Sequence, residues 1–81
     1  MARLQVTTQR IVEYHIARLQ NRDRNVRLES VRELALIKAA EALEALKEVY
    51  DNDPDIEVRK AAQEAGREIY FHHQNKEKSP K

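Results

Sequence analysis

The stretch Asp55-Ile56-Glu57-Val58-Arg59 repeats an earlier one, Asp23-Arg24-Asn25-Val26-Arg27, at an offset of 32 residues. The apolar positions around the two stretches recur at the same offset. Ile11, Tyr14 and Ala17 correspond to Leu43, Leu46 and Val49, Ser30 corresponds to Ala62, and Ile37 to Ile69. A period of this length is typical of stacked helical repeats. Such repeats mostly bind other molecules, so we expect function to lie on a surface rather than in a pocket.

The composition favours one small helical domain. The 81 residues are 36% charged and 41% hydrophobic, with one Gly, two Pro and no Cys. Few helix breakers and many good helix formers predict helices throughout. The absence of cysteine excludes a disulfide framework, a thiolate nucleophile and a cysteine-based metal site.

The sequence carries no targeting signal that we recognise. No apolar run approaches the ~20 residues that a membrane-spanning helix needs. The N-terminal residues 1–4 lack the apolar stretch of a signal peptide. We therefore expect a soluble, cytoplasmic protein.

The net charge of +1 is unevenly distributed. Residues 1–40 carry eight basic and four acidic side chains, residues 41–70 four basic and nine acidic, and residues 71–81 three basic and one acidic. This pattern fits an ordinary solvated surface. It also fits complementary ends that favour head-to-tail association or orient a charged partner.

Apolar residues at helical spacing predict most of the elements. In the first segment, Thr7 or Thr8 is the expected cap. One face comprises Leu4, Thr8, Ile11, His15 and Leu19, and is widened by Val12 and Ile16. The next segment starts around Asn21 and aligns Val26, Ser30, Leu34 and Ile37. The last starts with Asp53 as cap and Pro54 as first helical residue, and aligns Val58, Ala62, Ala65 and Ile69.

The stretch from residue 34 to residue 41 contains no turn-forming residue, so propensity alone allows one helix over residues 21–50. The apolar stripe, however, changes sides between Val26–Ile37 and Leu43–Tyr50. A compact chain should therefore fold back near residues 37–40. The alternative is an unbroken helix whose two faces serve different chains, as in a swapped dimer. We expect an ordered domain over residues 1–73 and a disordered polar tail over residues 74–81.

These features resemble a HEAT repeat, and most closely the bacterial and archaeal form that also occurs in phycobilisome lyases. The matching positions are Asp23, Val26, Arg27, Ser30, Leu34 and Ile37, then Asp55, Val58, Arg59, Ala62, Gly66 and Ile69. The resemblance covers about residues 9–70. It implies an all-α fold, a short α-α superhelix of about two HEAT-like repeats built from four helices in antiparallel pairs. It also implies a ladder of ion pairs between repeats, in which Arg27 would reach Asp55.

The four ladder residues also have a local interpretation. Asp23 and Arg27 are four residues apart, as are Asp55 and Arg59, so each pair is able to bridge within its own helical turn. In either arrangement we interpret Asp23, Arg27, Asp55 and Arg59 as structural residues that set the register of the repeats.

No group of residues predicts catalysis, a cofactor or a metal site. His15 lies on an apolar face, and the adjacent His72 and His73 point in different directions on a helix. The acidic cluster Asp51–Glu57 lacks the central Gly of a calcium-binding loop. There is no phosphate-binding glycine loop and no activated serine. We therefore predict that the protein is not an enzyme.

The predicted partner-binding face is the side of the second and fourth helices that points away from the core. It comprises Arg24, Leu28, Arg32 and Leu36, then Lys60, Glu64, Arg67 and Phe71. We predict a non-enzymatic protein–protein interaction or scaffolding module that self-associates, because two repeats leave both ends of the stack uncovered. The alternatives are a nucleic-acid-binding protein that uses the seven arginines of residues 3–32, and an accessory subunit of an enzyme.

Overall fold

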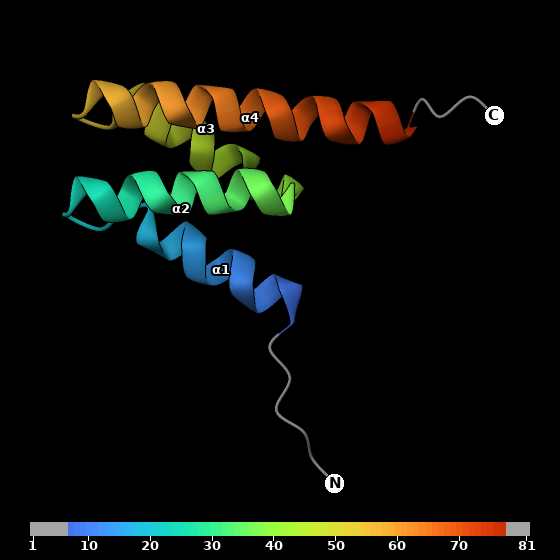
Figure 1. Cartoon of the computed structure of the whole chain (residues 1–81), viewed down its shortest axis with the longest axis horizontal. Coiled ribbons are helices and arrows are strands. Elements are labelled where there is room, and N and C mark those ends of the chain that lie inside the picture. Colours follow the sequence, from blue (N-terminus) through green and yellow to red (C-terminus); the bar gives the residue numbers. More distant parts are fainter. Residues whose placement is uncertain (1–6, 78–81) are drawn as a thin grey trace, which may run out of the picture.

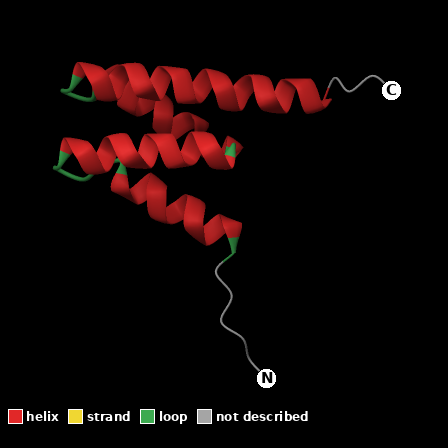
Figure 2. Cartoon of the chain, viewed as in Figure 1, coloured by secondary structure: helices red, strands yellow, loops and turns green. Residues whose placement is uncertain are grey.

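Two antiparallel helix pairs stack side by side in the computed structural model, which describes residues 7–77 (Figure 1). The elements are α1 (Thr8–Arg18), α2 (Arg24–Ile37), a 3-10 turn η1 (Ala40–Ala42), α3 (Leu43–Asn52) and α4 (Ile56–Glu77). Within the described residues there is no strand (Figure 2). Helix α2 lies between α1 and α4, while α3 packs mainly on α4. The predicted all-α fold of two helix pairs is confirmed.

The first two helices begin at side-chain caps. Thr7 caps α1 by accepting a hydrogen bond from the Arg10 amide at 3.2 Å, as predicted. The cap of α2 is Asp23, which accepts from the Asn25 amide at 2.8 Å. Asn21, the predicted start, instead accepts from the Asp23 amide at 2.8 Å. The helix therefore starts two residues later than the sequence suggested.

The start of α4 differs from the prediction in the same way. Asp53 is the C-terminal cap residue of α3 and Pro54 lies in the turn, so neither opens the last helix. Asp55 caps α4, because its Oδ1 accepts from the amides of Glu57 at 2.8 Å and Val58 at 3.2 Å. Two aspartates two residues apart are both able to cap, and the one nearer the helix does so.

The chain folds back where the apolar stripe changes sides. Helix α2 ends at Ile37, and Lys38 adopts the left-handed conformation (φ 60, ψ 44) that ends helices, although glycine is the common residue there. The Lys38 amide donates to the carbonyls of Leu34 and Ala35 at 3.1 Å. The predicted turn near residues 37–40 is confirmed, and the unbroken helix is wrong.

Helix α4 extends beyond the predicted domain boundary and holds this turn. His73 Nε2 lies 2.8 Å from the Lys38 carbonyl oxygen, and Lys38 Nζ lies 3.2 Å from a Glu68 carboxylate oxygen. The helix continues to Glu77, so residues 74–77 are not the disordered tail that was predicted. Residues 1–6 and 78–81, with the predicted contribution of Leu4, lie outside the described part.

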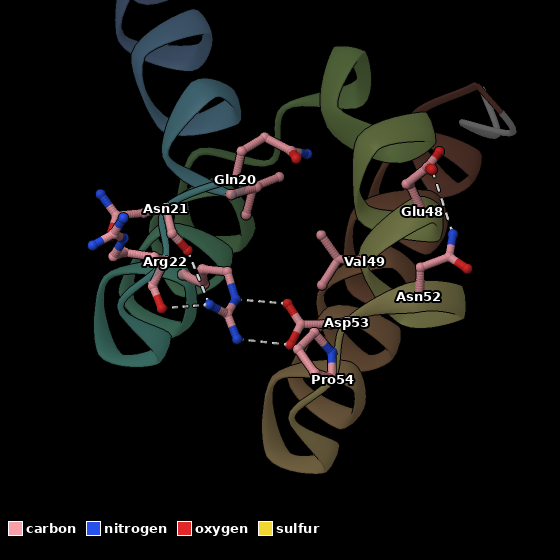
Figure 3. A pocket seen from close by; sticks show the side chains of 10 residues that line it. Gln20, Asn21, Arg22, Glu48, Val49, Asn52, Asp53 and Pro54 are labelled. Atoms are coloured by element: carbon pink, nitrogen blue, oxygen red, sulfur yellow. Dashed lines mark hydrogen bonds and ion pairs between the residues drawn. The ribbon is translucent and has the colours of Figure 1, made fainter.

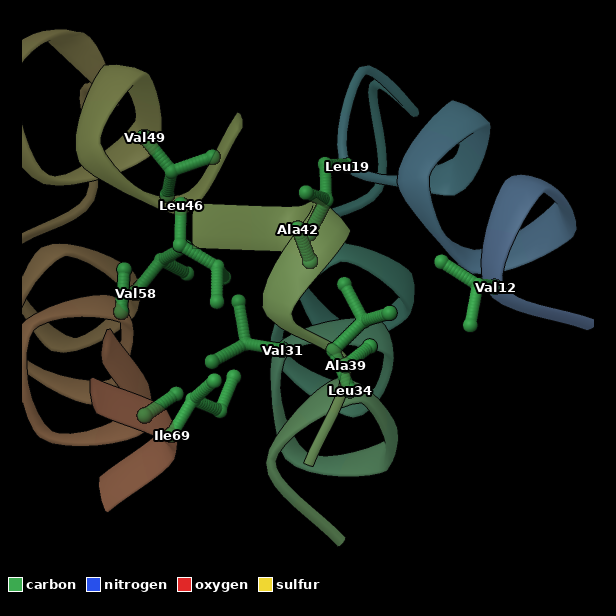
Figure 4. Close-up of a cluster of buried hydrophobic side chains, with 12 residues drawn as sticks. Val12, Leu19, Val31, Leu34, Ala39, Ala42, Leu46, Val49, Val58 and Ile69 are labelled. Carbon is green, nitrogen blue, oxygen red and sulfur yellow. The ribbon is translucent and has the colours of Figure 1, made fainter. Parts of the chain in front are cut away.

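The core lies where the four helices meet (Figure 4). All four residues of the predicted α4 stripe are buried. On α2, Ser30 and Leu34 are fully buried. On α1, Val12 and Leu19 of the predicted stripe are buried and Ile16 is half-buried, whereas Thr8 and Ile11 are exposed. Helix α1 diverges from α2 toward its N-terminus (Figure 1).

No helix in residues 7–77 is long and apolar enough to cross a membrane.

Leu34 and Leu36 offer a matched test of this core. Leu34 is fully buried, whereas Leu36, two residues later on the same helix, is 72% exposed. Leu34→Ala should reduce the free energy of unfolding by about 2–5 kcal/mol, because it removes buried methyl groups and leaves a cavity. Leu36→Ala should change it by less than about 0.5 kcal/mol. Urea unfolding measures both, and equal losses would contradict the arrangement of α2.

Candidate functional site

A buried ion pair joins the two repeats. The Arg27 guanidinium donates from Nε to Asp53 Oδ2 at 2.7 Å and from Nη2 to Oδ1 at 3.0 Å. Its Nη1 donates to the carbonyl oxygens of Asn21 at 2.9 Å and Arg22 at 3.1 Å. The side chains of Arg27 and Asp53 are only 10% and 4% exposed. Figure 3 shows Asp53 at the edge of the pocket between the two inter-helix turns.

A second, more exposed ion pair lies beside the first. Arg24 Nε donates to Asp55 Oδ2 at 2.8 Å, and Arg24 Nη2 donates to Glu57 Oε1 at 2.9 Å. Two arginines of α2 therefore hold three carboxylates from the segment that leads into α4. The pairs fix how the second repeat sits on the first.

The ion pairs between the repeats differ from those that the resemblance implied. Arg27 pairs with Asp53 rather than Asp55, because Asp55 is held by Arg24. Within residues 7–77, neither Asp23 with Arg27 nor Asp55 with Arg59 forms a salt bridge. Arg59 donates only from Nη1, to the Asp53 carbonyl oxygen at 3.2 Å.

The charge network changes the acidity of its members. The hydrogen bond from the Arg24 guanidinium lowers the pKa of Asp55 from 3.8 to about 2, and the amides of Val58 and Glu57 contribute to the same effect. The same hydrogen bond raises the pKa of Arg24. Both groups therefore stay ionised at neutral pH.

The pocket between the inter-helix turns has no reactive group. Arg27 and Asp53 use their polar atoms on each other, and the other polar lining residues are Gln20, Asn21, Arg22, Glu48 and Asn52. In the described part of the chain, no group of three His, Asp or Glu residues could hold a metal ion. We find no arrangement for acid–base or nucleophilic chemistry in this pocket.

The histidines have structural surroundings. His15 packs edge-on against the Tyr14 ring with centroids 5.0 Å apart, and its buried Nδ1 has no hydrogen-bond partner. His73 contacts the Lys38 carbonyl, and the His72 ring lies edge-on to the His73 ring. Sequence reasoning missed the role of His73, because its partner is 35 residues away in the chain.

The residues predicted to bind a partner occupy two separate surfaces. The first, here called the inner groove, lies between α2 and α4. It is lined by the predicted residues Leu28, Arg32, Leu36, Lys60 and Glu64, and also by Val31, Ala35, Glu57, Ala61, Ala65 and Glu68. Arg67 and Phe71 line a second hollow, here called the end groove, between α3 and α4. Arg24 is not free to bind a partner because it holds Asp55 and Glu57.

The predicted basic surface of the first 40 residues is partly neutralised. Arg18, Arg24 and Arg27 form salt bridges with Glu29, Asp55 and Asp53, and Glu57 joins Arg24. Three of the arginines proposed for nucleic-acid binding therefore face carboxylates.

The repeated helix pairs and the ion pairs between them define a stacked helical repeat protein. A family model for HEAT repeats matches residues 1–66, and the chain belongs to this family. The match does not distinguish the subtype found in phycobilisome lyases. No curated protein and no solved structure matches the chain.

Arg27 and Arg59 occupy the same position in the two repeats and provide a matched pair of substitutions. Arg27→Ala should cost about 3–5 kcal/mol of unfolding free energy, because it leaves the Asp53 carboxylate buried without its partner. Arg59→Ala should cost less than about 1 kcal/mol, since it has no buried acidic partner. Chemical denaturation measures the difference, and equal effects would refute the role of the buried pair.

Asp55 should make the protein sensitive to acid. Its pKa is lower in the folded state than in the unfolded chain, so it stabilises the fold above about pH 4. That stabilisation is lost as the pH falls from about 4 towards about 2. In Arg24→Gln this part of the pH dependence should shrink, as measured by melting temperature between these pH values. An unchanged acid profile in the variant would contradict the assignment.

Proposed function

We propose that the protein is a non-enzymatic protein–protein interaction module that holds a segment of a partner in the inner groove. HEAT repeats generally mediate interactions between proteins. The groove combines apolar contact area with charged side chains of both signs, a composition suited to protein recognition.

One observation carries this proposal: three charged side chains of the inner groove have no salt-bridge partner within the described residues, whereas Glu57 and Glu68 at its border pair with Arg24 and Lys38. Arg24, on the same side of α2, is held by two carboxylates. In contrast, Arg32, Lys60 and Glu64 are exposed and form no salt bridge or side-chain hydrogen bond within the described residues. Their ionic groups remain available to another chain.

The groove also indicates the chemistry of the partner. Leu36 is the most exposed large apolar residue of the described part, at 72%, and Ala61 lies on the opposite wall. A helical or extended segment with an apolar anchor near Leu36 and a carboxylate near Arg32 would fit these features. No observation comparably favours nucleic acid, since a row of stacking aromatic residues is absent from this surface in the described chain.

Affinity purification with paired variants tests the proposal. Arg32→Glu reverses one exposed charge in the groove and should abolish retention of the partner, because a carboxylate would then face a carboxylate. Glu44→Arg, on the exposed side of α3, makes an opposite reversal outside the groove and should retain the partner. Retained proteins are compared by mass spectrometry.

Photo-crosslinking localises the contact independently. A photoreactive side chain at Lys60 should crosslink to the retained protein, whereas one at Glu44 should not. The proposal is wrong if wild type and Arg32→Glu retain the same proteins, or if crosslinks form equally from both positions.

A further inference from the structure

The end groove lies on the side of the second repeat that faces away from the first. Apart from Lys47, Gln63 and Arg67, its lining is aliphatic, aromatic or glycine, and includes Leu43, Tyr50, Gly66, Tyr70 and Phe71. The three aromatic rings are 43%, 50% and 53% exposed, in the order of the chain. This is a concentrated apolar surface for so small a protein.

The two repeats have the same local geometry at an offset of 32 residues. The Asp23 amide donates to Asn21 Oδ1, and the Asp55 amide donates to Asp53 Oδ1. Arg27 Nη1 donates to the Asn21 carbonyl at 2.9 Å, and Arg59 Nη1 donates to the Asp53 carbonyl at 3.2 Å. Each position of the first repeat therefore has a structural equivalent in the second.

Equivalent positions of the two repeats differ in burial. The second repeat covers one side of the first repeat, whereas nothing in the described chain covers the same side of the second. Arg27 and Val31 are buried on α2, whereas their equivalents Arg59 and Gln63 on α4 are half-buried and exposed. The Nε and Nη2 groups of Arg27 bind Asp53, whereas those of Arg59 have no partner within the described residues. The end groove of the second repeat is thus equivalent to the surface of the first repeat that the second repeat covers.

The internal interface shows which surface would cover it. Ala35 of α2 and Ala65 of α4 both line the inner groove, and Lys38 Nζ lies 3.2 Å from a Glu68 carboxylate oxygen. One repeat later, Ala35 and Lys38 correspond to Arg67 and Tyr70. In another molecule, Ala65 and Glu68 correspond to Glu33 and Leu36. The equivalent pairs between molecules are therefore Arg67 with Glu33 and Tyr70 with Leu36. The first is an ion pair, and the second joins two exposed apolar side chains.

The buried arginine contact also has a counterpart. Between molecules, the equivalent of the Arg27–Asp53 pair is Arg59 with Asn21 of the other copy. The Asn21 side chain offers an amide oxygen where Asp53 offers a carboxylate oxygen. We propose that the end groove binds a second copy of this chain through a surface here called the outer side of α2, which comprises Glu33, Leu36 at the border of the inner groove, and Asn21 of the preceding turn. This contact would repeat the internal interface between molecules.

This contact is head-to-tail and does not close on itself. It joins two different surfaces, so every bound copy still offers a free end groove and a free outer side of α2, and longer stacks form. Two end grooves facing each other would instead bring the Arg67 residues of both copies together, with repulsion between like charges. The charge pattern therefore favours the head-to-tail arrangement.

Sedimentation velocity from about 1 µM to about 1 mM tests the proposal. The mean mass of the wild type should rise with concentration beyond that of a dimer. Arg67→Glu and Glu33→Arg should each weaken association at least about tenfold, because each places like charges at the contact. An equimolar mixture of the two variants should associate again, because each reversed charge meets its opposite.

Controls separate assembly from folding. Glu44→Arg, outside both surfaces, should associate like the wild type, and circular dichroism should show the same helix content for every variant. Leu36→Asp, at an exposed position, provides a second disruption of the outer side of α2. A wild type that stays monomeric over the whole range overturns the proposal. So does unchanged association in Glu33→Arg and Leu36→Asp, which would indicate a symmetric contact through the end grooves.

This inference rests on the proposed function as an interaction module, but the two fail separately. Loss of the Arg67 effect, with partner retention still dependent on Arg32, overturns the assembly alone. Loss of the Arg32 effect, with association still dependent on Arg67, overturns the inner groove alone.

Discussion

The burial of the Arg27 guanidinium is the constraint on which the arrangement of the repeats depends. A charged group in a protein interior is costly unless it is paired and its hydrogen-bonding groups are satisfied. Arg27 meets this condition only when Asp53 from one turn and two carbonyl groups from the other lie around it. The pair therefore fixes the distance between the two inter-helix turns, and with it the register of α2 on α4.

The same requirement explains the distribution of acidic residues. Residues 41–70 are net acidic, yet Asp53, Asp55, Glu57 and Glu68 all pair with basic residues of the first 40. The charged residues that line the end groove, Lys47 and Arg67, are both basic. A charge count along the chain thus gives a misleading impression of the charge at the surface.

Much of the fold could be predicted from the sequence. The 32-residue offset predicts two equivalent helix pairs, and the change of stripe predicts the turn near Lys38 because a buried face must stay on one side. The exact caps could not be predicted, since Asn21 and Asp23, like Asp53 and Asp55, are equally good capping residues two positions apart. The left-handed conformation of Lys38 carries no local signal in the sequence.

The candidate surfaces were harder to predict than the fold. A helical projection places Arg24, Arg32 and Arg67 away from the core, but it does not show which carboxylates approach from the next repeat. That depends on stacking, which pairs Arg24 with Asp55 and Glu57 and places Arg67 in another groove. The role of His73 is likewise set by a contact across 35 residues, which no local pattern encodes.

The contact between the end of α4 and the α2–α3 turn has a mechanical consequence. A pulling force applied at the C-terminal end of α4 reaches His73 and Glu68, and through them the carbonyl and ammonium groups of Lys38. Because Lys38 connects the two repeats, the force is distributed over both of them. Without this contact, the force would separate α4 from α3 one helical turn at a time. Under tension, the last helix is thus tied to the connection between the two repeats.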